Sequence, residues 1–287
     1  MSPQDSRRGQ ADREDLSINN TVFRRLLTLV ALRTTARLYK RSGVCVPISG
    51  GLLVKSDAFV DLTEAATIRF IAERTTIPVP KVYCSFLHNG RAFIVIERIR
   101  GEPIANGWDE RSEESKVHLV SRLRDIFREL RRLEPPNDAG VRSCVGGSLL
   151  DSRMPRPDHR FGPFETVQEF HSWLRAGLRT DGARDGGISE DDWRGIKAMA
   201  AKQDGPWPPP VFTHADVSPS NILVRGDDVV GIIDWEFSGW YPHYWEYTSA
   251  WTGSHSSVWR DLLPRFLDAH PEELEMETTR QRFWGGH

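Results

Sequence analysis

The spacing of apolar residues along the chain predicts several helices. Within 17–40, apolar residues recur at helical intervals at Val22, Leu26, Leu29 and Val30. The same period predicts further helices over 61–76, 112–134 and 165–178. The aromatic-rich tail from Tyr241 onward is also expected to be helical.

Short apolar runs bounded by turn residues predict the strands. Residues 42–57 contain two such runs joined at Gly50-Gly51, which is typical of a hairpin, and Pro47 places the first run at a sheet edge. Further strands are expected at 91–99, 211–213, 221–225 and 229–233, the last two joined by the "RGDD" turn. Residues 135–163 are rich in Pro, Gly, Asp and Arg and are interpreted as a long loop or an insertion. Strands first and mostly helices afterwards indicate an α+β, two-lobed fold.

Composition excludes several classes of protein. A net charge of −2 gives no global basic field, so no nucleic-acid partner is expected. The three cysteines include no C-x-x-C pair, which favours free thiols in a reducing compartment over a disulfide framework or a zinc site. The polar N-terminus lacks the apolar core of a signal peptide, and no apolar run reaches the length of a membrane span. We therefore expect a cytoplasmic protein without a membrane partner, and the oligomeric state is left open.

The stretch "FTHADVSPSNILV" carries candidate chemistry, because it places His214, Asp216 and Asn221 between two apolar runs. If strands 221–225 and 229–233 pair, Asn221 comes close to Asp234. Carboxylate and amide oxygens are ligands that suit Mg²⁺ together with substrate phosphates. Asp216 can then accept the proton of an attacking hydroxyl, which is the arrangement of phosphoryl transfer in protein kinases. The alternative is a polar turn in which Asp and Asn bond the backbone. His214 is expected to be structural.

A second candidate pair is Lys55, at the end of a predicted strand, with Glu64 on the following helix. Asp61 and Glu64 fit a variant of the capping box, which would explain Glu64 without any function. However, Glu64 shares one helical face with Ile68 and Ile71, so it needs a buried partner. Lys55 is the expected partner, and its own alternative is an exposed strand lysine.

These motifs carry a resemblance to a known family. "HADVSPSNILV" followed by "VVGIIDWEFSGWYP" resembles the aminoglycoside phosphotransferase and choline kinase-like superfamily, closest to a fungal branch of it. "LLVKS" is similar to the nucleotide-binding strand, "FIVIERIRGEPI" to the hinge, and "GPF" with "EFHSWL" to a segment of that branch. The resemblance runs from about Ser42 to Trp251. It implies a protein kinase-like fold, with a disordered start at 1–16, a small β-rich lobe at 17–97 and a larger, mainly helical lobe at 98–287.

The resemblance also implies the roles of the site residues. Asp216 is the expected catalytic base, and Mg²⁺ is expected on Asn221 and Asp234. The nucleotide, ATP or GTP, is expected to contact the strand lysine, the helix glutamate and two hinge residues: Lys55, Glu64, Glu97 and Ile99.

The chain departs from protein kinases in ways that bear on its substrate. The G-x-G-x-x-G loop is absent, because Gly43, Gly50 and Gly51 are too far apart. Ser218 stands where protein kinases have a lysine, and no A-P-E segment follows Asp234. These features favour phosphoryl transfer to a hydroxyl of a small molecule. The alternatives are a nucleotide- or metabolite-binding pseudokinase, and a kinase-like fold used for other metabolite chemistry.

The C-terminal part leaves two questions open. The aromatic cluster at 235–251 is interpreted as a packed core, with a ligand cage as the alternative. Within it, Glu236 and Glu246 either line the acceptor site or brace the catalytic loop. The later acidic run is interpreted as a solvated helix face, although it would favour a cationic acceptor if it faced the cleft: Glu272, Glu273, Glu275 and Glu277.

Overall fold

The computed structural model describes residues 16–137, 140–151, 153–154, 160–180 and 187–285. The chain divides into two compact units, which are described separately. The first unit extends up to Arg122 and includes Pro219–Glu236, and the second contains Leu123–Ser218 and Phe237 onward. The predicted lobes at 17–97 and 98–287 follow from the family resemblance, whereas these two units are defined by how compactly the chain packs. The predicted lobe limits therefore stay a prediction.

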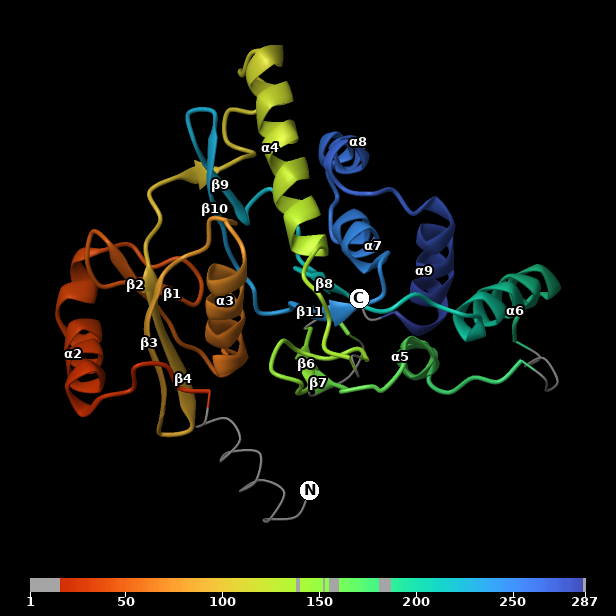
Figure 1. The fold of residues 1–287 in the computed structure, drawn as a ribbon, viewed down its shortest axis with the longest axis horizontal. Helices are drawn as coiled ribbons and strands as arrows, with labels where there is room; N and C mark the ends of the chain where they lie inside the picture. The colour runs from red at the N-terminus through yellow and green to blue at the C-terminus, as the bar shows by residue number, and fades with distance from the viewer. Residues whose placement is uncertain (1–15, 138–139, 152, 155–159, 181–186, 286–287) are drawn as a thin grey trace. The chain divides into compact units, whose positions relative to one another are not determined.

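The first unit contains a four-stranded antiparallel sheet in the order β1-β2-β4-β3 (Figure 1). Its strands are β1 (Cys45–Pro47), β2 (Leu52–Lys55), β3 (Val82–His88) and β4 (Arg91–Glu97). The hairpin predicted at Gly50-Gly51 is confirmed, since Pro47 pairs with Leu53. Pro47 lies on an edge strand, where its missing N–H disrupts no ladder hydrogen bond.

Two helices cover the two faces of this sheet (Figure 1). Strand alternation sends Phe93 and Val95 to one face and Ile94 to the other. Helix α2 (Val22–Arg33) packs Leu32 into the cluster that contains Val95, and a short 3-10 turn (Thr35–Leu38) follows it. Helix α3 (Leu62–Arg74) packs against β3 and β4, and Asp61 caps its first turn by accepting from the N–H of Thr63 at 2.9 Å.

A second, three-stranded sheet in the first unit has the order β10-β9-β5. Its strands are β5 (Glu102–Pro103), β9 (Ile222–Arg225) and β10 (Asp228–Ile232). The predicted "RGDD" hairpin is confirmed, because Arg225 pairs with Asp228 and Gly226 supplies the left-handed turn residue. At the open end of the hairpin, the N–H of Ile233 donates to the carbonyl of Asn221 at 2.9 Å. This pairing brings Asn221 next to the residue that precedes Asp234.

The second unit is mainly helical. The long helix α4 (Glu113–Arg131) contains the boundary between the units. Its further helices are α5 (Val167–Leu174), α6 (Glu190–Asp204), α7 (Trp245–Thr252), α8 (Ser257–Phe266) and α9 (Pro271–Trp284). Two short antiparallel pairs accompany them: β6 (Leu149–Leu150) with β7 (Arg160–Phe161), and β8 (Val211–Thr213) with β11 (Gly239–Tyr241).

Three sequence predictions change in the second unit. Helix α6 was not predicted, because its buried apolar residues form only a short stripe among charged ones: Ile196, Met199 and Ala200. The region 135–163 is not loop throughout, since β6 and β7 pair within it. Tyr241 lies in strand β11 and not in a helix, because its segment pairs with β8 before α7 begins.

The aromatic cluster forms the core of the second unit. Tyr241 and Trp245 are buried, and their rings stack at 5.5 Å between centroids. Tyr244 is fully buried beside them. The packed-core interpretation is therefore confirmed. Within the described ranges, the helices are all too short or too polar to meet the requirement for a transmembrane span.

Candidate active site

In the first unit, Lys55 joins two carboxylates. Its ammonium lies 2.7 Å from Oε1 of Glu64 and 2.6 Å from Oδ1 of Asp234. The last residue of β2 supplies the lysine, the first turn of α3 supplies Glu64, and the end of the β9–β10 hairpin leads into Asp234. The predicted contact between Lys55 and Glu64 is confirmed, and the Glu64 carboxylate bonds Lys55 rather than the backbone N–H of Asp61 that a capping box would require.

The electrostatics of this cluster keep Lys55 charged. Burial by itself would lower the pKa of Lys55, but the carboxylates of Glu64 and Asp234 outweigh burial and hold that pKa above its usual value. Asp234 has a φ of 68°, a left-handed conformation that is uncommon outside glycine. Strained residues of this kind concentrate at ligand-binding and catalytic sites.

The oxygens around Asp234 fit a divalent cation. Ligand atoms of Glu64, Asp234 and Glu236 all lie within 4.8 Å of one another. Oε2 of Glu64 is buried and, among the described residues, has no hydrogen-bond partner. Oxygen-only donors of this kind suit Mg²⁺. Sequence reasoning predicted Asn221 and Asp234 as ligands, but it assigned Glu236 to the acceptor site or the loop. The D-x-E spacing after an apolar strand could have indicated its place beside Asp234.

The two predicted hinge residues lie at the end of β4 and just beyond it. The backbone N–H of Glu97 donates to the carbonyl of Lys81, and the Glu97 carboxylate accepts from the N–H of Lys81 at 3.2 Å. Ile99 is half-buried, and a Cβ at Gly231 would come within 2.6 Å of it. Contact of either residue with a nucleotide stays a prediction.

In the second unit, Glu246 holds the loop that carries Asp216. Its two carboxylate oxygens accept from the backbone N–H groups of His214 and Ala215, both at 2.8 Å. Glu246 is fully buried in the first turn of α7, so it braces the loop. Nδ1 of the buried His214 accepts from the N–H of Asp216 at 3.2 Å, which confirms the structural role expected of this histidine.

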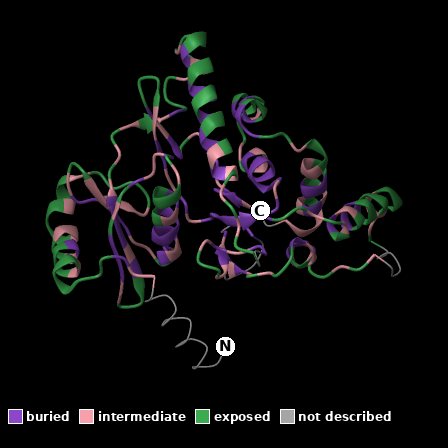
Figure 2. Ribbon diagram, in the orientation of Figure 1, coloured by how far each residue is buried: buried purple, intermediate pink, exposed green. Residues whose placement is uncertain are grey.

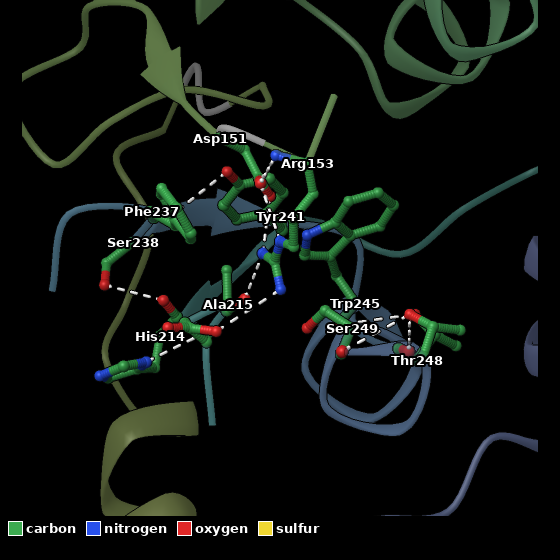
Figure 3. A network of polar contacts seen from close by, with 12 residues as sticks. Asp151, Arg153, His214, Ala215, Phe237, Ser238, Tyr241, Trp245, Thr248 and Ser249 are labelled. Atoms are coloured by element: carbon green, nitrogen blue, oxygen red, sulfur yellow. Dashed lines mark hydrogen bonds and ion pairs between the residues drawn. The ribbon is translucent and has the colours of Figure 1, made fainter. Parts of the chain in front are cut away.

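Arg153 makes the second connection to this loop (Figure 3). The buried Asp151 carboxylate accepts from Nε at 2.8 Å and from Nη2 at 2.6 Å. Nη2 also donates to the carbonyl of Ala215 at 2.6 Å, and Nη1 lies 3.6 Å from Oδ1 of Asp216. Burial opposes the charge on Arg153, but Asp151 outweighs it and holds the pKa of Arg153 above its usual value. The guanidinium also lies 4.9 Å from the ring of Phe237.

Sequence reasoning missed Arg153 because it lies in the Pro- and Gly-rich stretch. An Asp-x-Arg pair there carries no periodic signal, and it is also common on surfaces. The fixed arrangement of Asp151, Arg153 and Ala215 appears only once the chain is folded. Since Ala215 has a φ of 67°, the loop adopts a strained conformation that these bonds maintain.

A cavity of about 380 Å³ in the second unit is bordered by Arg153. Its wall includes hydroxyl-bearing residues of α7, and Figure 3 labels two of them, Thr248 and Ser249, on that helix. Two ion pairs balance its charge: Asp151 with Arg153, and Glu277 with Arg280 at 2.8 Å. Small polar molecules fit such a cavity in size and chemistry.

The acidic run near the C-terminus has several different environments. Glu277 lines this cavity but is paired with Arg280, while Glu272 and Glu273 both contact Lys202 at 2.9 Å. Glu275 is exposed. The run therefore gives the cavity no net negative charge, and it does not favour a cationic acceptor.

A sequence model of the phosphotransferase enzyme family (APH) matches residues 62–283, which is more than half of the 287 residues. A search of curated proteins found no match. The fold is similar to a ternary complex of a thermostable mutant of aminoglycoside phosphotransferase APH(4)-Ia with ADP and hygromycin B. The TM-score is 0.58, with 12 % identity over 84 % of this chain and 82 % of that one.

A second solved structure with a similar fold is the streptomycin–ATP–APH(2″)-IIa ternary complex. The TM-score is 0.55, with 15 % identity over 93 % of this chain and 88 % of that one. At these identities the likeness concerns the fold, and it confirms the predicted α+β, protein kinase-like class.

Proposed function

The chain belongs to the phosphotransferase enzyme family, and from this premise we propose that it transfers the γ-phosphoryl group of ATP to a hydroxyl of a small molecule. The observation that carries the proposal is the buried contact of Lys55 with both Glu64 and Asp234. A fold maintained by packing alone has no need of a buried cation between two carboxylates, because their desolvation is unfavourable.

The first unit is proposed to hold the nucleotide phosphates. The charged Lys55 would bind phosphate oxygens, and Glu64 would keep its ammonium in place. Mg²⁺ would be held by Asp234 and Asn221, with Glu236 close by, and would supply positive charge against the phosphates. The backbone of Glu97 and Ile99 is proposed to meet the base of ATP or GTP.

Asp216 is proposed to orient the acceptor hydroxyl and accept its proton. Glu246 and His214 fix the backbone on either side of it, and Arg153 limits the movement of its carboxylate. Positioning and charge neutralisation supply most of the rate in phosphoryl transfer, so a rigid loop serves this role. The cavity bordered by Arg153 would then take the acceptor, which we propose to be a polar, hydroxylated small molecule.

The proposal is tested by an ATP-consumption screen with Mg²⁺ over hydroxylated metabolites, using wild type and Asp216→Asn. We expect ADP formation with at least one acceptor, and a phosphorylated product of low mass. Asp216→Asn keeps the size of the side chain and should lower turnover by about 10² to 10⁴-fold without loss of ATP binding.

A binding-only function is the alternative that the absent G-x-G-x-x-G loop favours. It predicts ATP binding in calorimetry with no product from any acceptor. Loss of ATP binding in Asp216→Asn, with normal turnover per bound nucleotide, would instead contradict the roles assigned to the two units.

A further inference from the structure

The outer face of helix α2 is apolar and open to solvent. Its large side chains are more than half exposed: Val22 (75 %), Phe23 (69 %), Leu26 (57 %), Leu27 (53 %) and Val30 (54 %). These positions follow the spacing i, i+1, i+4, i+5 and i+8, so they form one continuous face. Leu38, in the turn that follows the helix, is 81 % exposed. Figure 2 shows the corresponding exposed colour along α2.

This exposure is unusual for the described part of the chain. The opposite side of α2, with Thr28 buried and Leu32 half-buried, already packs on the sheet. The exposed face therefore does not contribute to the core of the first unit. Apolar side chains that gather on one exposed face are typical of an interaction surface.

The same segment is strongly basic. Residues 16–56 contain no Asp or Glu, and the stretch from Arg24 to Arg41 carries six cations: Arg24, Arg25, Arg33, Arg37, Lys40 and Arg41. Arg24 and Arg25 donate to the carbonyl of Tyr83 and the side chain of Asn20. In the part of the chain that the structure describes, none of the six contacts a carboxylate.

From the apolar face and the cations within and just after the same helix, we infer that α2 docks the protein on the surface of a membrane that contains anionic lipids. An amphipathic helix with basic flanks lies in the plane of the interface, with its apolar side chains among the acyl chains and its cations at the headgroups. With 12 residues, α2 is far shorter than the roughly 20 residues that cross a bilayer. The docking is therefore peripheral, and it departs from the sequence expectation that no membrane partner exists.

The charge pattern disfavours the other occupants of this face. Two copies docked through α2 would bring two sets of six cations together without any carboxylate between them. Residues 1–15 offer no apolar side chain larger than alanine apart from Met1 and Pro3, so they supply no matching apolar surface. Nucleic acid would use the cations but would leave the aliphatic face exposed to water.

The test is co-flotation of the full chain with vesicles of phosphatidylcholine alone, or with about 30 % phosphatidylserine. Leu26→Asp/Leu27→Asp changes the apolar face, and the matched control Val117→Asp/Val258→Asp changes two apolar side chains that are 55 % and 51 % exposed elsewhere. Arg33→Glu/Arg37→Glu changes the flanking charge. Its control is Arg128→Glu/Arg132→Glu, which changes an exposed arginine in the last turn of α4 and another just after the helix ends.

We expect wild type and both controls to float with the anionic vesicles and not with phosphatidylcholine alone, and raised salt to release them. Both α2 variants should lose about tenfold or more of this partitioning. All four variants should keep the wild-type unfolding midpoint, because every changed side chain is exposed.

Failure of wild type to float with anionic vesicles would overturn the inference, as would equal flotation of the α2 variants and their controls. Sedimentation velocity without lipid identifies the main rival. A wild-type dimer that Leu26→Asp/Leu27→Asp dissociates would assign this face to a second copy and not to lipid.

Discussion

Arg153 lies 3.6 Å from the carboxylate of Asp216, and Asp151 holds it there through two hydrogen bonds. Asp151 is almost fully buried, so the guanidinium is fixed from the protein side before any acceptor binds. Arg153 is therefore a positioning residue for Asp216 in the proposed reaction.

Replacement of Arg153 should lower turnover. Arg153→Gln removes the charge and the planar guanidinium, so Asp216 and the carbonyl of Ala215 lose their contacts with this side chain. We expect about a 10²-fold fall in kcat. Arg153→Lys should recover only part of it, since an ammonium cannot make the same planar contacts. ATP affinity should stay near the wild-type value in both. Steady-state kinetics measure both effects. The control is Arg260→Gln, because Arg260 donates to the carbonyl of Trp251 and, among the described residues, makes no polar contact with the Asp216 loop.

Glu246→Gln should weaken both the loop and the fold. The amide places an NH₂ group where the carboxylate accepts from one of two backbone N–H groups, so one buried donor loses its partner. We expect a loss of about 1–3 kcal/mol in the free energy of unfolding. Urea titration measures it, and Glu275→Gln at an exposed position of α9 should change little. An unchanged unfolding curve for Glu246→Gln would contradict the bracing role.

Asp234→Asn should uncouple Mg²⁺ from nucleotide binding. The substitution removes the charged oxygen that contacts Lys55 and that belongs to the proposed metal site. Calorimetry with and without Mg²⁺ should show tighter ATP binding with the metal in wild type only. Glu64→Gln is a useful comparison, because it disturbs the Lys55 contact directly, and it should weaken ATP binding with or without Mg²⁺. If Asp234→Asn retained full Mg²⁺ coupling, the metal assignment would be wrong.

His171 should make stability depend on pH. Burial lowers the pKa of His171 from 6.5 to about 4, so at neutral pH the ring is uncharged, with Nδ1 facing the carbonyl of Gln203 at 3.1 Å and Nε2 facing the hydroxyl of Tyr244 at 2.7 Å. The unfolded chain takes up a proton near pH 6.5, which the folded protein resists until about pH 4. The stability that His171 contributes is thus present above pH 6.5 and is lost as the pH falls, by about 2 kcal/mol between pH 7 and pH 5.

The matched variants for this prediction are His171→Gln and His118→Gln. Glutamine cannot titrate, and its side chain offers both a donor and an acceptor. Between pH 7 and pH 5, the free energy of unfolding of His171→Gln should therefore fall by about 2 kcal/mol less than that of wild type. His118 is exposed on α4, and its replacement should keep the wild-type dependence. If urea titrations gave all three proteins the same change in unfolding free energy between pH 7 and pH 5, an uncharged His171 would be contradicted.

The parts of the site that sequence reasoning found are those fixed by local pattern. A glutamate on an apolar helix face requires a buried cation, and this identified the contact between Lys55 and Glu64. A turn between two apolar strands fixes their register, and this register predicted that Asn221 lies beside Ile233, the residue before Asp234. The catalytic, metal and nucleotide roles of these residues, the fungal branch and the cytoplasmic location stay predictions.

The parts that sequence reasoning missed depend on tertiary contacts. Nothing in the pattern around Arg153 says that it reaches Ala215, and Glu246 had two open interpretations until its bonds to the loop were known. Helical periodicity predicted α2 from Val22 and Leu26 but could not say which face meets water, because a buried stripe and an exposed stripe have the same period. In this helix the apolar residues that gave the signal are largely the exposed ones.

The left-handed backbone of Ala215 has a consequence for how this loop can vary. One methyl group at a φ of 67° costs about 1–2 kcal/mol, which a glycine would avoid. A glycine would also give the unfolded chain, and a loosened loop, more conformations. Alanine therefore lowers the stability of the folded protein somewhat, but it restricts the backbone conformations open to the loop beside Asp216. Substitutions at position 215 should thus change thermal stability and the precision of the Asp216 position in opposite directions.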